Sequence, residues 1–178
     1  MNGLTTLMKN RFISKLFPIL LFIISILFMT GCKTETPNEH ISNEIKLDVS
    51  GCTIINDNDT HGGIHGDGER MISLDCSNTN ILERVNKWNR LPLSDNLGIV
   101  MYSGEKNGEI YGYDLAKDNN IPKIDNGYYY FVDRYTKYYK DYEDIYSDYK
   151  LLDRTSMNFI VAMYDLDTNY LYYYEYDS

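Results

Sequence analysis

The sequence is poor in the residues that most often perform catalysis. It has only three His and three Cys in 178 residues, and a single Trp. No G-x-S-x-G motif occurs, and no Cys lies beside a His in a recognisable nucleophile motif. Nothing therefore points to nucleophilic catalysis. A paired-carboxylate hydrolase stays open without being indicated, because 17 Asp and 9 Glu always allow a pair of carboxylates.

Basic residues are in the minority. The chain has 17 Lys and Arg against 26 Asp and Glu. Residues 1–31 hold three of the bases and no acid, so the remainder has 14 bases against 26 acids and a formal charge of −12. A nucleic-acid partner is not expected, since it would require a basic face. The acidic charge indicates solubility, with a basic partner or a cation as the alternative.

The chain lacks an apolar run long enough to cross a membrane near its start. Leu16 to Met29 are 14 residues without charge, and Pro18 lies inside them. As a helix they would span roughly 21 Å, which is short of the ~30 Å hydrocarbon core. Lys9, Arg11 and Lys15 precede the run. This arrangement is typical of a signal peptide.

The end of this segment, Met29-Thr30-Gly31-Cys32, resembles a bacterial lipobox. The resemblance implies cleavage before Cys32 and a diacylglyceryl group on its sulfur. We expect residues 1–31 to be a lipoprotein signal peptide and Cys32 to carry acyl chains that hold the protein at the extracytoplasmic face of the cell membrane. The alternatives are an uncleaved anchor and a secretory signal whose cysteine is incidental.

The mature chain divides into a short polar segment and one domain. Lys33 to Glu44 is polar and shows no apolar periodicity, so residues 32–44 are expected to be a lipidated Cys and a flexible tether. Ile45 to Ser178 has the length and the apolar content of a single domain with a real core.

Alternating apolar residues between turn signals predict a mainly antiparallel sheet of about six to seven strands. Asn107-Gly108 is a hairpin signal, and Asp125-Asn126-Gly127 is a turn. Asn158–Tyr164 is apolar on both faces, which favours a central strand. The candidate strands are Ile45–Val49, Cys52–Asn56, Arg70–Cys76, Leu97–Tyr102, Glu109–Leu115, Tyr128–Tyr135, Asn158–Tyr164 and Tyr170–Tyr176.

One main helix is expected, over Asn80–Lys87. Asn80 is a suitable N-cap, and Glu83 stands three residues later, as in a capping box. Pro92 follows as a stop signal. Tyr135–Tyr149 has aromatic residues at helical spacing but is rich in Asp and Lys, so a helix and a charged excursion both fit. Together these features predict an α+β fold.

The densest run of metal-ligand types is the Gly-rich stretch Asp57–Glu69. It half matches a calcium loop, but Gly68 stands where a bidentate Glu is required. Two imidazoles with an Asp would instead suit zinc or copper. A purely structural hairpin loop and a catalytic loop are the alternatives. The metal candidates are Asp57, Asp59, His61, His65 and Asp67, and a divalent metal is the one cofactor that the sequence suggests.

Three stretches resemble a group of small uncharacterised lipoproteins of low-GC Gram-positive bacteria. They are the loop THGGIHGDG at residues 60–68, WNRLPL at 88–93 and YDLDTNYLYY at 164–173. The resemblance would cover most of Ile45 to Ser178. It implies an envelope location and nothing about activity.

Tyrosine is concentrated late in the chain, and four residues fall on one face of the last strand. A tyrosine stripe can grip a protein or stack on sugars, because each ring is apolar with a polar tip. The alternative is a sheet face covered by a second layer. The stripe consists of Tyr170, Tyr172, Tyr174 and Tyr176.

The remaining cysteines, Cys52 and Cys76, are expected to form a disulfide, since export permits oxidation. An antiparallel register that pairs them also pairs Ile54 with Leu74 and Asn56 with Ile72. Cys52, Ile54, Ile72, Leu74 and Cys76 would then share one buried face. Two buried free thiols are the alternative.

The sequence therefore favours a membrane-anchored envelope lipoprotein that acts as a non-enzymatic binding module. Its partner would be a protein, a wall polymer or an ion, and an inhibitor or immunity-like role belongs to the same class. A metal-dependent enzyme centred on His61 and His65 is the alternative. A two-lobed transport receptor ranks last, because the domain is small for it.

Overall fold

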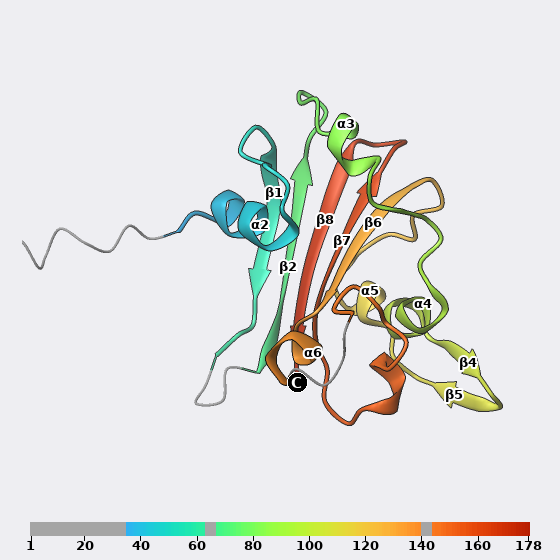
Figure 1. The fold of residues 1–178 in the computed structure, drawn as a ribbon. Coiled ribbons are helices and arrows are strands. Elements are labelled where there is room, and N and C mark those ends of the chain that lie inside the picture. The colour runs from blue at the N-terminus through green and yellow to red at the C-terminus, as the bar shows by residue number, and fades with distance from the viewer. Residues whose placement is uncertain (1–34, 63–66, 140–143) are drawn as a thin grey trace, which may run out of the picture. The chain divides into compact units, whose positions relative to one another are not determined.

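The computed structural model describes residues 35–62, 67–139 and 144–178, of which Thr36–Ser178 forms one compact unit (Figure 1). The expected signal peptide, the lipidation site Cys32 and the metal candidate His65 lie outside the described residues. Among the described residues, no helix has the length and the apolar character needed to span a membrane.

The fold is α+β and dominated by an antiparallel sheet, as the sequence predicts. Six strands lie in the order β1-β2-β8-β7-β6-β3, and a separate hairpin forms a second, two-stranded sheet. The strands of the main sheet are β1 (Thr53–Asp59), β2 (Gly68–Asp75), β3 (Asn89–Arg90), β6 (Gly127–Asp133), β7 (Asn158–Asp165) and β8 (Tyr170–Asp177). The hairpin pairs β4 (Gly104–Lys106) with β5 (Glu109–Tyr111) across the expected Asn107-Gly108 turn.

Short helices cover the sheet on both sides. Figure 1 shows α2 crossing near the β1 and β2 edge, and α4 and α5 beside the far strands. The helices are α2 (Pro37–Ile45), α3 (Leu82–Val85), α4 (Asp95–Tyr102), α5 (Leu115–Asp118) and α6 (Arg134–Tyr139), with a 3₁₀ turn at Leu151–Asp153.

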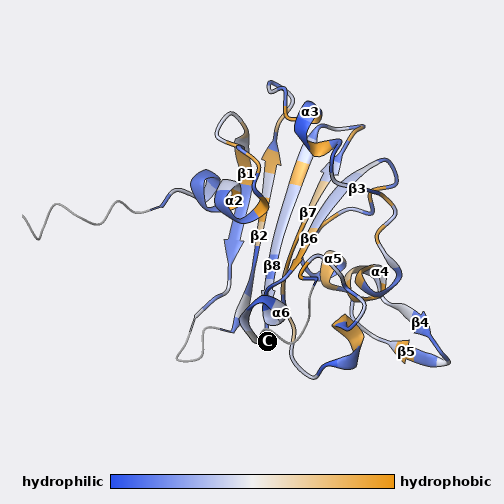
Figure 2. Ribbon diagram, in the orientation of Figure 1, coloured by the Kyte–Doolittle hydropathy of each residue, from blue (hydrophilic) through white to orange (hydrophobic). Residues whose placement is uncertain are grey.

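The sheet is apolar on both faces, so it forms the middle layer of the domain. On one face Ile72, Tyr173 and Ala162 are paired across β2, β8 and β7, and they belong to a core cluster with Ile41 and Ile45 of α2. The opposite face packs against α4 and α5 through a second cluster, which includes Leu97, Leu115, Phe131, Val161 and Tyr174. Figure 2 shows hydrophobic colouring along β6 and β7, a paler β8, and an edge strand β1 that becomes hydrophilic toward its end.

The expected tether Lys33–Glu44 is wrong from Pro37 onward, where the chain is helical. Thr36 caps α2 by accepting a hydrogen bond from the Glu39 N–H, and the Glu39 carboxylate accepts one from the Thr36 N–H. Ile41 and Ile45 lie on the inner face of this helix and are fully buried. The capping box and two apolar residues four apart therefore outweigh the polar composition.

Three other expected elements also differ. Ile45–Val49 is not a strand but the end of α2 and the loop after it, in which Leu47 and Val49 are buried. The expected main helix Asn80–Lys87 is a single turn whose N-cap is Ile81, with no side-chain cap. Leu97–Tyr102 is helical rather than extended. A short apolar run does not distinguish a buried strand from a buried helix.

The ambiguous stretch Tyr135–Tyr149 begins as a helix. Residues 135–139 belong to α6, whereas 144–149 contains turns and no regular helix. Of the other expected strands, Glu109–Leu115 is a strand only over Glu109–Tyr111, since Leu115 already begins α5, and the rest are present with slightly different ends. β7 is central, and all six of its inner positions are buried.

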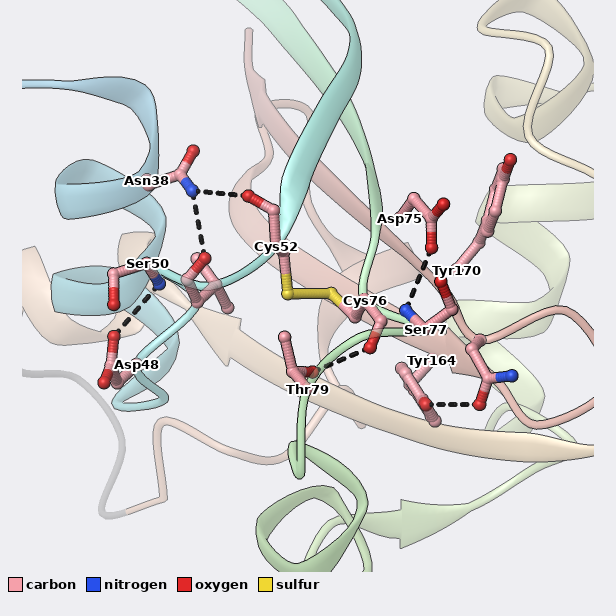
Figure 3. The surroundings of a disulfide bond; sticks show 12 residues. Asn38, Asp48, Ser50, Cys52, Asp75, Cys76, Ser77, Thr79, Tyr164 and Tyr170 are labelled. Carbon is pink, nitrogen blue, oxygen red and sulfur yellow. Dashed lines mark hydrogen bonds between the residues drawn. A yellow bond between two sulfur atoms is a disulfide. The ribbon is translucent and has the colours of Figure 1, made fainter.

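Cys52 and Cys76 are joined by a disulfide, with their Cα atoms 4.5 Å apart (Figure 3). The expected register holds beside it, where Ile54 pairs with Leu74. It fails further along, because a bulge after Ile54 makes Asn56 pair with Ser73 rather than with Ile72. Ile54 is also 37% exposed instead of buried, since β1 is an edge strand whose residues are all exposed.

Candidate functional site

A pocket lies at the end of the sheet where β2 begins and β8 ends. It has a volume of about 630 Å³. Five of its ten lining residues are basic or imidazole-bearing and three are acidic, although acids outnumber bases in the chain. They come from α2, β1, β2, α6, β7 and β8, and from the loop after β1. The lining residues are His40, Asp59, His61, Arg70, Arg134, Lys137, Tyr138, Asn158, Glu175 and Asp177.

The register of the strands places three charged residues side by side at the floor of this pocket. Asp59 of β1 pairs with Arg70 of β2, and Arg70 pairs with Glu175 of β8. Residues paired across strands point to the same face of a sheet. The three charged side chains therefore form one row of alternating sign, on the face that α2 covers.

Glu175 is the centre of a buried ion-pair network. The residue is 5% exposed, and its carboxylate accepts a hydrogen bond from Arg134 Nη1 and lies 2.8 Å from His40 Nε2. Burial alone would raise the pKa of the Glu175 carboxyl. The hydrogen bond to His40 and the charge of Arg134 outweigh burial and lower that pKa to about 2. Glu175 is therefore ionised throughout the physiological pH range.

Arg134 is held in place from two sides. Its Nε donates to Asn158 Oδ1 at 2.6 Å while Nη1 binds Glu175. The Asn158 amide in turn donates to Asp177 Oδ2 at 2.8 Å. This chain of partners fixes the guanidinium against the ends of β7 and β8, which orients it without a ligand.

The second half of the pocket is built around Arg70. Its Nε and Nη2 donate to the two carboxylate oxygens of Asp57 at 2.9 and 2.8 Å. His61 places its Nδ1 2.8 Å and its backbone N–H 2.9 Å from Asp59 Oδ1. Desolvation would raise the pKa of Asp59, but the hydrogen bonds from His61 and the nearby charges lower it.

These contacts engage the carboxylates that the sequence suggests as metal ligands. Asp57 is used by Arg70 and Asp59 by His61, while Asp67 is exposed and His65 lies outside the described residues. Within the described ranges no group of three or more His, Cys, Asp or Glu is arranged to hold a metal. The divalent-metal site therefore stays a prediction.

The tyrosine stripe of β8 faces the core cluster under α4 and α5. Tyr174 is fully buried and its hydroxyl donates to Glu69 Oε2 at 2.5 Å. Tyr176 packs against Phe159 with ring centroids 5.6 Å apart. Tyr170 and Tyr172 are only half-buried, and their rings are 6.4 Å apart. Tyr174 therefore serves packing, whereas Tyr170, Tyr172 and Tyr176 keep part of their surface exposed for contact with a partner.

Sequence reasoning missed the central residues of the pocket. Glu175 carried a usable signal, because it stands at a core position of β8 in line with Leu171 and Tyr173. A charged residue on an apolar face requires a partner. His40 was hidden because it lay in the expected tether, and Arg134 had no signal, since pairing with Glu175 depends on tertiary structure.

The pocket has more hydrogen-bond donors than its own acceptors use. Within residues 35–62, 67–139 and 144–178, no acceptor is bound to Arg70 Nη1, Arg134 Nη2 or Lys137 Nζ. The carboxylates of Asp59 and Glu175, by contrast, already accept hydrogen bonds, Asp59 from His61 and Glu175 from His40 and Arg134. The pocket can therefore satisfy an acceptor-rich group without losing its own pairs.

Comparison with known proteins identifies no relative. No protein-family model matches the chain, and no curated protein and no solved structure matches it. The resemblance to low-GC Gram-positive lipoproteins therefore stays a prediction.

Proposed function

We propose that this chain is a lipoprotein, anchored through Cys32 at the extracytoplasmic face of the cell membrane, and that its domain is a non-enzymatic binding module for an anionic ligand. The observation that carries the proposal is the surplus of cationic donors in the pocket of Arg70, Arg134 and Lys137. The apolar run followed by Met29-Thr30-Gly31-Cys32 supports the anchor.

An anionic group suits the pocket for two reasons. Phosphate and carboxylate oxygens accept several charge-assisted hydrogen bonds, and guanidinium groups are the side chains best shaped to donate them. Both guanidinium groups are also held by carboxylates before any ligand arrives, so little side-chain entropy is lost on binding. Lys137 is exposed and has no ion-pair partner among the described residues, so it is free to close on the ligand.

The spacing between anchor and domain supports an envelope role. Four residue steps separate Cys32 from Thr36, the first residue of the compact unit. Even fully extended they reach only about 14 Å. If Cys32 is lipidated, the domain works close to the membrane surface, where phosphate-bearing wall polymers and lipid headgroups are within reach.

Isothermal titration of the full chain in detergent tests the proposal, with inorganic phosphate, glycerol 3-phosphate and acetate as probes. We expect saturable binding of at least one anion, weakened by roughly fivefold in Lys137→Ala through loss of one charge-assisted contact. Lys123→Ala, an exposed lysine elsewhere, is the matched control. Preference for the phosphates over acetate separates the two ligand classes. No binding, or equal binding by Lys137→Ala, contradicts the proposal.

A metal-dependent enzyme at His61 and His65 is the second candidate, and one contact favours it. A carboxylate on Nδ1, as Asp59 provides for His61, is the arrangement that orients a metal-binding imidazole. Metal analysis of protein purified without a chelator tests it. A stoichiometric metal that is lost in the His61→Ala/His65→Ala variant would favour the enzyme over the simple binding module.

A further inference from the structure

A second, smaller pocket is formed by aromatic residues on the side of the sheet that α2 and α3 cover. Its volume is about 270 Å³, and it runs between the segment after α3 and the middle of β6. Trp88 and Tyr130 lie with ring centroids 5.5 Å apart, and Tyr130 and Tyr146 with centroids 6.0 Å apart. Tyr146 is 54% exposed, while the other two rings are half-buried. Three adjoining rings are therefore accessible to solvent.

The backbone segments that carry these rings are held by hydrogen bonds. Tyr130 lies in β6, paired with Ala162 of the central strand. The backbone N–H of Trp88 donates to the Val85 carbonyl at 2.9 Å, at the end of α3. At the last residue of β6, the backbone N–H of Asp133 donates to the Ile145 carbonyl at 2.8 Å, which fixes the backbone beside Tyr146. The aromatic surface is preformed, so a ligand would not have to order it.

We propose that this aromatic groove, defined by Trp88, Tyr130 and Tyr146 with Lys87 and Asn89 at its rim, binds a sugar unit of a glycan. The C–H faces of a pyranose ring are apolar and slightly positive, and they suit the negative faces of aromatic rings. The hydroxyl groups around the sugar require polar partners, which the exposed Lys87 and Asn89 provide.

Charge and size favour a sugar over a protein partner. None of the residues that line the groove is acidic, although the chain has 26 Asp and Glu. The volume is slightly below the usual range for small-molecule pockets, ~300–1,000 Å³, and fits one or two sugar rings. A stable protein interface needs about 800 Å² on each partner, which a groove of this size does not offer. This inference is independent of the anion pocket, with which the groove shares no lining residue.

The single tryptophan makes the proposal directly testable, because all Trp emission of the chain comes from the groove. The full chain, in a detergent without a sugar headgroup, is titrated with tri-N-acetylchitotriose, with cellotriose and with a short apolar peptide. We expect a saturable change in Trp88 emission with at least one trisaccharide. Tyr146→Ala should weaken binding by roughly fivefold, the effect of one lost aromatic contact.

Two variants control the test. Tyr149→Ala removes an equally exposed tyrosine outside the groove and should bind as the parent does. Asn89→Ala changes an exposed rim residue and should also weaken binding. It replaces Tyr146→Ala as the test if that variant is unstable. The proposal is overturned if the emission responds to neither trisaccharide. It is also overturned if Tyr146→Ala and Asn89→Ala both bind a trisaccharide as tightly as the parent does. A response to the peptide alone also overturns it and assigns the groove to a protein partner.

Discussion

The buried carboxylate of Glu175 should make the stability of this domain depend on pH in an acidic window. The perturbation is Glu175→Gln, which keeps the shape of the side chain and removes its charge. Gln leaves Arg134, the first residue of α6, without its carboxylate partner. Breaking a buried pair by removing one member typically costs about 3–5 kcal/mol, and we expect a loss of this size near neutral pH.

The pH dependence follows from the pKa of Glu175, which is lowered from 4.5 to about 2 in the folded state. A group with a lowered folded pKa stabilises the protein fully above its unfolded pKa, and this contribution disappears as pH falls toward the folded pKa. The difference corresponds to roughly 3 kcal/mol. Solvent should screen little of this free energy, because the Glu175 side chain is only 7% exposed. The contribution of Glu175 to the unfolding free energy should therefore be lost between about pH 4.5 and pH 2.

Urea unfolding followed by Trp88 fluorescence measures this directly, since Trp88 is the single tryptophan. The gap in unfolding free energy between the parent and Glu175→Gln should narrow by about 3 kcal/mol between about pH 6 and pH 2. Glu83→Gln, an exposed change in α3, is the control and should leave the pH profile unaltered. A gap that stays constant across this range would show that Glu175 is not an ionised, paired carboxylate, and the network described above would be wrong.

Three further outcomes follow. Cys52→Ala/Cys76→Ala should lower the unfolding free energy by about 3 kcal/mol, the loop-entropy value for a closure of this length; two alkylated thiols in non-reduced exported protein would refute the disulfide. Cys32→Ala should leave an unprocessed precursor near 20.8 kDa without acyl label, and normal processing would exclude the lipoprotein. Arg154→Met should cost roughly 3–5 kcal/mol by stranding the buried Asp133, and an unchanged urea midpoint would contradict that pair.

The sheet could be predicted from the sequence because its strands carry local signals. Asn158–Tyr164 and Tyr170–Tyr176 are long, apolar and bounded by turn residues, so their identity does not depend on what packs against them. The hairpin at Asn107-Gly108 was also readable, since both turn residues take the positive φ that this turn needs. The bulge in β1 was not, because nothing in its sequence marks the extra residue.

The helices were harder to predict, since each one depends on burial or on capping rather than on length. Asn80–Lys87 looked well capped, yet only one turn forms there and Pro92 follows soon after. In Thr36–Ile45 the composition suggested disorder, but a capping box and two buried isoleucines produce a helix. That error also concealed His40, and with it the link between α2 and the pocket. Local polarity was therefore the least reliable guide to this domain.

The position of Glu175 allows a role in ligand binding to be distinguished from a role in packing. An apolar side chain there would fill the space under α2 without the cost of desolvating a carboxylate, and replacing a buried ion pair by apolar residues is often neutral or stabilising by about 1–4 kcal/mol. We therefore expect Glu175→Met/Arg134→Met to unfold at the same urea concentration as the parent or a higher one. If the pair serves the ligand, the same variant should lose anion binding in the phosphate titration. A double variant that is less stable than the parent and still binds phosphate would contradict this role in ligand binding. The pair would then serve only the stability of the fold.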